Sequence, residues 1–195
     1  APFIAPGLVG GATTEDEGLR LVQQLRPDLL LLTEDLETGY GIRLMQRVHE
    51  HGAGTRMLIF LTRETQEVVQ EAMQAHADGV ILRSSMGSGR GDFIQALQTL
   101  SRGGVYYPED VREMVVSPHS DDRPQFVEHL SEREKEVVSA VARGLTNGEI
   151  ATAFKISTET VKSHLSNCMN NLAVRDRTQL AVSALLYGLI DPQAV

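Results

Sequence analysis

Residues 130–190 read LSEREKEVVSAVARGLTNGEIATAFKISTETVKSHLSNCMNNLAVRDRTQLAVSALLYGLI. Apolar residues recur in this stretch at helical spacing, and turn residues interrupt the pattern, which predicts four short helices in sequence. Ser131 followed by Glu134 is the pattern of a capping box and opens the first helix, and Gly144 ends it. This half of the chain is therefore predicted to be all-α.

The second and third predicted helices form a pair. Either Thr146 or Asn147 caps the second helix, and a tight break at Lys155 leads to a new cap at residues 157–160. The third helix has an apolar face and an opposite face rich in hydroxyl, amide and ammonium groups, formed by Lys162, Ser163, Ser166, Asn167 and Asn170. Such a pair describes a helix-turn-helix that reads base edges in the major groove. A small helical bundle with a solvated polar face is the alternative that the pattern leaves open.

The stretch as a whole resembles the LuxR-type (GerE) helix-turn-helix domain, through LSEREKEVVSAVARGLTNGEIA, TVKSHLSN and the final LLYGLI. The resemblance implies that double-stranded DNA is the partner and that the helix-turn-helix runs from Asn147 to Ser166. It places four side chains toward the bases: Lys162, Ser163, Ser166 and Asn167. It places seven near phosphates: Thr146, Asn147, Thr158, Thr160, Lys155, Arg175 and Arg177. Gly148 and Asn171 stand where the family often has lysine, which predicts fewer phosphate contacts and weaker salt dependence.

Charge and composition fit a sequence-specific DNA-binding protein better than a nonspecific polyanion binder. The net charge is −8, and residues 127–195 carry seven basic against eight acidic side chains, so −7 lies in residues 1–126. We find no apolar run as long as a membrane span and no secretory leader, so we expect no membrane association. The single cysteine, Cys168, lies on an apolar helix face, which favours core packing and a cytoplasmic location.

The first half alternates buried strands with amphipathic helices. Strands are predicted at residues 29–32, 57–61 and 80–82, and helices at residues 42–51, 64–76 and 92–101. An earlier helix opens at a cap with acidic residues, residues 13–17, and runs through Leu25. Leu8-Val9-Gly10 could add a short strand. This alternation is typical of a doubly wound α/β domain with a parallel sheet, in which functional groups gather at the carboxyl ends of the strands. Those ends are residues 33–35, 62–63 and 83–85.

This half resembles the receiver domain of NarL/FixJ-type response regulators, through RPDLLLL, GI, MLIFLT, AHADGVILRSS and GGVYYPEDV. The resemblance places Thr33 where the family has its phosphate-accepting aspartate. Thr62 matches the family's switch threonine or serine, Arg83 replaces its lysine, and Glu37 replaces a proline. The acidic pair that holds magnesium would lie on an earlier strand, and residues 1–11 show no such strand. We expect that this strand and its helix either lie outside the chain or have been lost.

These replacements predict a receiver without phosphorelay chemistry. The hydroxyl of Thr33 is not the carboxylate that an acyl phosphate requires, and without the acidic pair there is little to bind Mg²⁺. Asp35 or Glu34 could be a displaced acceptor, but the spacing fits the family without a shift. We therefore interpret Glu34, Asp35 and Glu37 as a solvated acidic loop, with no cofactor.

The predicted organisation is a receiver-like domain at residues 1–107, a proline-containing linker at 108–129 and the helix-turn-helix domain at 130–195. Within the linker, residues 111–116 could form one short helix. The sequence predicts a transcription regulator that acts without aspartyl phosphorylation and binds its operator as a homodimer. Its input would be a regulatory protein or a small-molecule signal at the receiver-like domain. The alternative is a protein-interaction module that sequesters a partner regulator and hardly touches DNA.

We expect no enzymatic activity, because the histidines are scattered and show no metal or nucleophile spacing. Gly87-Ser88-Gly89-Arg90-Gly91 lacks the lysine and the strand context of a phosphate-binding loop. The closing helix, residues 176–190, carries leucines that would either pair two DNA-binding domains or pack in the core. These are Leu180, Leu185, Leu186 and Leu189.

Overall fold

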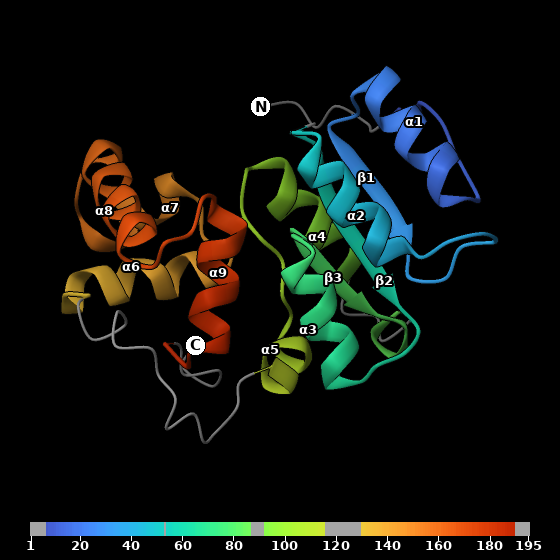
Figure 1. Cartoon of the computed structure of the whole chain (residues 1–195). Helices are drawn as coiled ribbons and strands as arrows, with labels where there is room; N and C mark the ends of the chain where they lie inside the picture. The colour runs from blue at the N-terminus through green and yellow to red at the C-terminus, as the bar shows by residue number, and fades with distance from the viewer. Residues whose placement is uncertain (1–6, 53, 87–91, 116–129, 190–195) are drawn as a thin grey trace.

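The computed structural model describes residues 7–52, 54–86, 92–115 and 130–189 (Figure 1). The first half contains strands and helices in alternation: α1 (Glu15–Leu25), β1 (Leu29–Thr33), α2 (Gly41–Glu50), β2 (Arg56–Leu61), α3 (Gln66–Gln74), β3 (Gly79–Leu82), a 3-10 turn (Arg83–Ser85), α4 (Asp92–Ser101) and α5 (Glu109–Val115). The second half is helical within these residues: α6 (Glu132–Ala142), α7 (Asn147–Phe154), α8 (Thr158–Asn171) and α9 (Arg177–Leu186). The predicted combination of an α/β half and an all-α half is confirmed.

The three described strands form a parallel sheet in the order β1-β2-β3, as the alternating pattern predicted. Successive residues of β2 point to opposite faces. Met57, Ile59 and Leu61 pack in the main core with residues of α2 and α3. Leu58 and Phe60 pack on the other face, against α4. Helices therefore cover both faces of the sheet, which explains why the strands read as continuous apolar runs.

Two segments differ from the sequence prediction. Leu8-Val9-Gly10 is not a strand, and the side chain of Leu8 is 94% exposed. An apolar tripeptide becomes a strand only when a neighbouring strand pairs with its backbone groups. Helix α5 starts at Glu109, two residues before the short helix that the sequence indicated within the linker, and its Val111 and Val115 are buried against the first half. The rest of that segment, residues 116–129, lies outside the described residues.

A buried carboxylate fixes α1 to α2. Thr14 caps α1, and Glu15 in its first turn is only 6% exposed. Oε2 of Glu15 lies 2.7 Å from the guanidinium of Arg43, and Oε1 lies 2.9 Å from that of Arg47. The hydrogen bond from Arg43 is the main cause that lowers the pKa of Glu15 to about 2, against the opposing effect of burial. This carboxylate therefore stays ionised and keeps both arginines in place.

Three of the four helices of the second half, α6, α7 and α8, begin at the predicted caps. Ser131 with Glu134 and Thr146 with Glu149 form complete capping boxes, and Ser157 caps α8. Of the two open choices, Thr146 is thus the cap of α7. Leu180 and Leu185 of α9 are fully buried against the core that α6 and α8 share. Core packing, rather than a free pairing surface, is therefore the role of these two leucines.

The two halves pack directly against each other, with α9 beside α3 and α5 (Figure 1). The hydroxyl of Thr178 donates a buried hydrogen bond of 2.7 Å to Asp78. Gly104 and Gly144 meet so closely that a Cβ on Gly104 would lie 2.4 Å from the carbonyl oxygen of Gly144. Apolar residues of both halves belong to one continuous core.

None of the helices in the described ranges is both long enough and apolar enough to cross a bilayer.

Gly41→Ala should destabilise the first half by more than about 2 kcal/mol, because its new Cβ would lie 1.9 Å from the carbonyl oxygen of Thr33 at the end of β1. Urea unfolding measures this loss as a lower midpoint. Gly148→Ala is the matched control, since no atom lies within 4 Å of its Cβ position. The control should gain up to about 1 kcal/mol from helix propensity. Equal midpoints for the two variants would contradict the close approach at Gly41.

Candidate functional site

Helices α7 and α8 form a helix-turn-helix whose turn is defined by local backbone geometry. Lys155 ends α7 in the left-handed region, with a φ of 54°. Two residues later Ser157 caps α8, and its Oγ accepts a hydrogen bond of 3.0 Å from the backbone N–H of Thr160. Val161 and Leu165 then bury one face of α8 against α6 and α7. The orientation of α8 is thus fixed by its cap and by its apolar face.

The opposite face of α8 is open to solvent. All four side chains predicted to face bases, Lys162, Ser163, Ser166 and Asn167, are exposed. The ammonium of Lys162 lies 2.8 Å from the carboxylate of Glu159, also on the surface. An exposed pair of this kind contributes little stability, so Lys162 can exchange Glu159 for another anion. The polar side chains of this face are therefore free of the core packing that holds α8 in place.

Several of the predicted phosphate-contacting residues line one hollow of about 720 Å³ beside α8. Thr146, Asn147, Arg175 and Arg177 belong to it together with Lys162. Arg102 and Gly103 of the first half form part of its lining. The remaining predicted residues, Lys155, Thr158 and Thr160, are exposed at the turn and at the start of α8, outside this hollow.

Arg177 and Asn147 differ from the other members of this group because they bind each other. The guanidinium of Arg177 donates a hydrogen bond of 2.9 Å to Oδ1 of Asn147. It donates a second hydrogen bond to the carbonyl oxygen of Leu145. Burial, together with the positive charge of Arg56, lowers the pKa of Arg177 to about 10. In this arrangement the two side chains connect α7 to α9. Sequence reasoning missed this contact because 30 residues separate the partners.

The carboxyl ends of β1 and β2 bring a second group of predicted residues together. The hydroxyl of Thr33 donates a hydrogen bond of 2.8 Å to the carbonyl oxygen of Asp35. The hydroxyl of Thr62 lies 2.8 Å from Oε1 of Glu34 and 3.5 Å from Oδ2 of Asp35. Arg83 is exposed in the turn after β3. Thr33 and Thr62 therefore converge on one short acidic loop.

The prediction of a solvated acidic loop is wrong for Glu34 and holds for its neighbours. Asp35 and Glu37 are exposed, but Glu34 is fully buried. Its Oε1 accepts hydrogen bonds from Thr62 and from both the backbone N–H and the Nε of Arg63. A buried carboxylate needs such charged and polar partners. Glu34 follows Leu32 by two residues, so strand alternation puts it on the same face as Leu32, and this spacing is the sequence signal that could have revealed its burial.

Arg63 and Tyr40 complete this group. The sequence placed Arg63 at the end of its strand without a role, and it did not predict Tyr40. The guanidinium of Arg63 donates a hydrogen bond of 3.2 Å to the hydroxyl of Tyr40, and that hydroxyl donates a hydrogen bond of 2.8 Å to the carboxylate of Glu71. Burial and the carboxylate of Glu71 raise the pKa of Tyr40 to about 12. A continuous hydrogen-bonded path thus runs from Glu34 at the end of β1 to Glu71 on α3.

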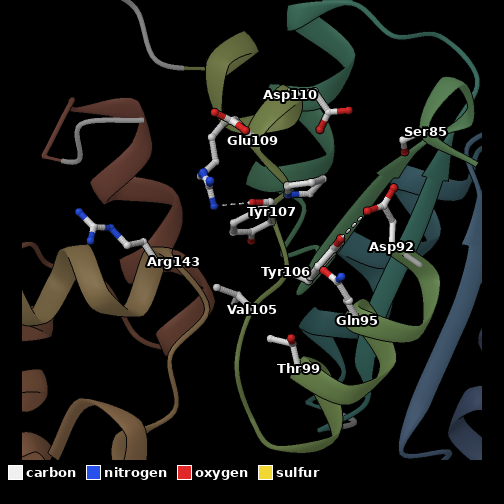
Figure 2. A pocket seen from close by; sticks show the side chains of 12 residues that line it. Ser85, Asp92, Gln95, Thr99, Val105, Tyr106, Tyr107, Glu109, Asp110 and Arg143 are labelled. Atoms are coloured by element: carbon white, nitrogen blue, oxygen red, sulfur yellow. Dashed lines mark hydrogen bonds between the residues drawn. The ribbon is translucent and has the colours of Figure 1, made fainter. Parts of the chain in front are cut away.

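A separate cavity of about 380 Å³ opens near the contact between the two halves (Figure 2). Asp92, Tyr106 and Glu109 of the first half and Arg143 of the second half contribute to its lining. The hydroxyl of Tyr106 donates a hydrogen bond of 3.3 Å to the carboxylate of Asp92. Burial and that carboxylate raise the pKa of Tyr106 to about 12. The cavity offers both acidic and basic side chains to a polar molecule.

Comparison with known families identifies the class. Residues 7–88 match the family described as the response regulator receiver domain, and residues 128–184 match GerE, the bacterial regulatory proteins of the luxR family. The chain belongs to the LuxR-type response regulators, which are transcription factors and not enzymes.

Individual proteins are similar over most of the chain. The response regulator protein VraR of Staphylococcus aureus (strain Mu3 / ATCC 700698) is 30% identical over 185 residues, which span 94% of this chain and 86% of VraR. RcsB of Salmonella typhimurium is similar in structure at 20% identity, with a TM-score of 0.46, over 87% of this chain and 80% of RcsB. A structure of two RcsB dimers bound to two parallel DNAs aligns at 20% identity and a TM-score of 0.49, over 92% and 84% of the two chains.

Arg63→Ala should lower the free energy of unfolding by about 2 kcal/mol, because it removes a charged donor from the buried carboxylate of Glu34. In a Glu34→Met background the same change should cost less than about 0.5 kcal/mol, since the carboxylate is gone. A double-mutant cycle by urea unfolding gives the coupling. Arg83→Ala, an exposed arginine at the same edge, is the control. Additive effects of the two changes would show that Arg63 and Glu34 do not interact.

Proposed function

We propose that this chain is a DNA-binding transcription regulator whose receiver domain signals without phosphorylation of an aspartate at the end of β1. The observation that supports this most directly is the arrangement around Thr33 and Thr62. Thr33 occupies the acceptor-equivalent position, and its hydroxyl donates to the backbone of Asp35. The switch-equivalent Thr62 donates to the buried carboxylate of Glu34.

A buried carboxylate, that of Glu34, is the chain neighbour of Thr33, the acceptor-equivalent position. Phosphorylation alters proteins by adding negative charge and strong acceptors that reorient nearby donors. Here Glu34 supplies a permanent acceptor for Thr62 and Arg63, so these donors stay in one arrangement. The receiver domain would therefore respond to a different input. A small polar molecule in the cavity lined by Asp92, Tyr106 and Arg143, or a regulatory protein, would supply it.

The second half would carry the DNA-binding activity. Its open α8 face offers the hydroxyl, amide and ammonium groups that major-groove readout uses. Thr146, Thr158, Thr160, Lys155 and Arg175 would contact phosphates around it. A homodimer would place two such helices about 34 Å apart, one turn of duplex. We assign residues 1–107 to the receiver-like domain, 108–129 to the connection, of which α5 is part, and 130–195 to the DNA-binding domain.

Incubation with acetyl phosphate should give no stoichiometric phosphoryl adduct, because Thr33 lacks the carboxylate for an acyl phosphate. Intact-protein mass spectrometry at neutral pH detects the adduct directly, and operator affinity should be the same with and without acetyl phosphate. Asp35→Asn is the informative companion variant. A labile adduct on the parent chain that disappears in Asp35→Asn would overturn the proposal and identify Asp35 as a displaced acceptor.

Lys162→Ala should weaken binding to a selected operator fragment by about 1–3 kcal/mol, since it removes an exposed cation from the base-facing side of α8. Gly148→Lys should strengthen binding and increase the salt slope by about 1, because its Cβ position is open and a lysine there can reach a phosphate. Fluorescence anisotropy at several salt concentrations measures both. Lys135→Ala on α6 serves as the control. If the parent chain binds DNA weakly and neither Lys162→Ala nor Gly148→Lys changes that binding, the result would instead support a module that sequesters a partner regulator.

A further inference from the structure

Three potential metal ligands from distant parts of the chain meet where α9 packs against the first half. His49 lies near the end of α2, His76 follows α3, and Asp176 caps α9. Oδ2 of Asp176 lies 3.5 Å from Nδ1 of His76 and 4.0 Å from Nε2 of His49. The three ligand atoms all lie within 4.8 Å of one another. Sequence reasoning missed this group because 27 and 100 residues separate its members.

The ligand atoms have capacity for a further bond. Nδ1 of His76 is buried, and within the described part of the chain it makes no hydrogen bond. Oδ1 of Asp176 accepts the backbone N–H of Gln179 at 2.8 Å, which leaves Oδ2 directed at the histidines. Neutral imidazole and ionised carboxylate are the forms that coordinate metals.

The surrounding contacts hold the group together. Two residues beyond His76, the carboxylate of Asp78 accepts a buried 2.7 Å hydrogen bond from Thr178, which lies two residues beyond Asp176. The same hydrogen bond therefore sets the separation of His76 and Asp176. Arg56 lies 2.6 Å from Asp78 and compensates its charge. The carboxylate of Asp176, oriented by the N–H of Gln179, is the negative charge of the group itself.

We propose that His49, His76 and Asp176 bind a divalent metal ion of the zinc class and that this ion fastens α9 to the receiver domain. Two imidazole nitrogens and one carboxylate oxygen form a ligand set that Zn²⁺ accepts, with water as a fourth ligand. In a tetrahedral zinc site, neighbouring ligand atoms are about 3.3 Å apart. The separations of 3.5 and 4.0 Å to Asp176 lie close to that value. The site belongs to both halves of the molecule and is independent of the proposed mode of signalling.

Binding requires one specific movement. The rings of His49 and His76 are stacked at a centroid distance of 3.4 Å and an interplanar angle of 6°. The lone pair of each nitrogen lies in the plane of its ring, so the rings must open before one ion can lie in both planes. The side chain of His49 is 41% exposed and can make this movement, whereas that of His76 is 16% exposed and stays in place.

The test titrates chelator-treated full chain with ZnCl₂ in a calorimeter. We expect one saturable site per chain, and a higher melting temperature in the presence of zinc because the ion binds the folded state. His49→Ala, His76→Ala and Asp176→Asn should each weaken binding by at least about tenfold. Asparagine keeps the helix cap while it removes the charged ligand, so Asp176→Asn retains α9. His51→Ala is the matched control, since His51 adjoins the end of α2 but lies outside the group.

A second measurement tests the location of the ion. Hydrogen exchange should slow on addition of zinc in the peptides that hold His76 and the start of α9, and should not slow in His49→Ala. Melting temperatures of the variants without metal establish that each is folded. The proposal fails if the parent chain shows no saturable site, or if His51→Ala loses zinc affinity as much as His49→Ala does. It also fails if zinc binds without any change in exchange at α9.

Discussion

The carboxylate of Asp78 is the contact on which the arrangement of the two halves depends. It is 6% exposed and accepts three hydrogen bonds, from Arg56, from the backbone N–H of Met57 and from Thr178. The first two fix it to β2, and the third reaches α9 across the junction. A buried carboxylate that loses a donor is costly, so the start of α9 is held at a fixed position beside the sheet.

Much of the functional geometry follows from that position. Because α9 is fixed, Arg177 reaches back to Asn147 and holds the start of α7, and Asp176 meets the two histidines. The hollow beside α8 is then lined from both halves, by Arg102 as well as by Lys162. If a ligand of one half binds more tightly when the two halves are packed together, it favours the packed arrangement. Binding at the other half then changes by the same coupling free energy. The junction is thus a physical route by which the first half can influence DNA binding.

The backbone after β1 turns sharply, and one glycine makes this turn possible. Gly41 lets the backbone after β1 approach the carbonyl oxygen of Thr33, and the loop between them carries the acidic residues. Within that loop Glu34 points inward to Thr62 and Arg63, whereas Asp35 points to solvent. The hydrogen-bonded path continues through Tyr40 to Glu71. A charge buried here is therefore connected to α3, which packs against α9.

The sequence by itself determined the local structure: the caps at Thr14, Ser131 and Ser157, the continuous apolar strands, and the exposed polar face of α8. These features depend on residues three or four apart, or on short apolar runs, so pattern alone reveals them. Only the tertiary structure decided that Glu34 is buried, that Arg177 binds Asn147, and that His49, His76 and Asp176 share one place. Their partners lie 27 to 100 residues away, at separations where no periodicity links one residue to another.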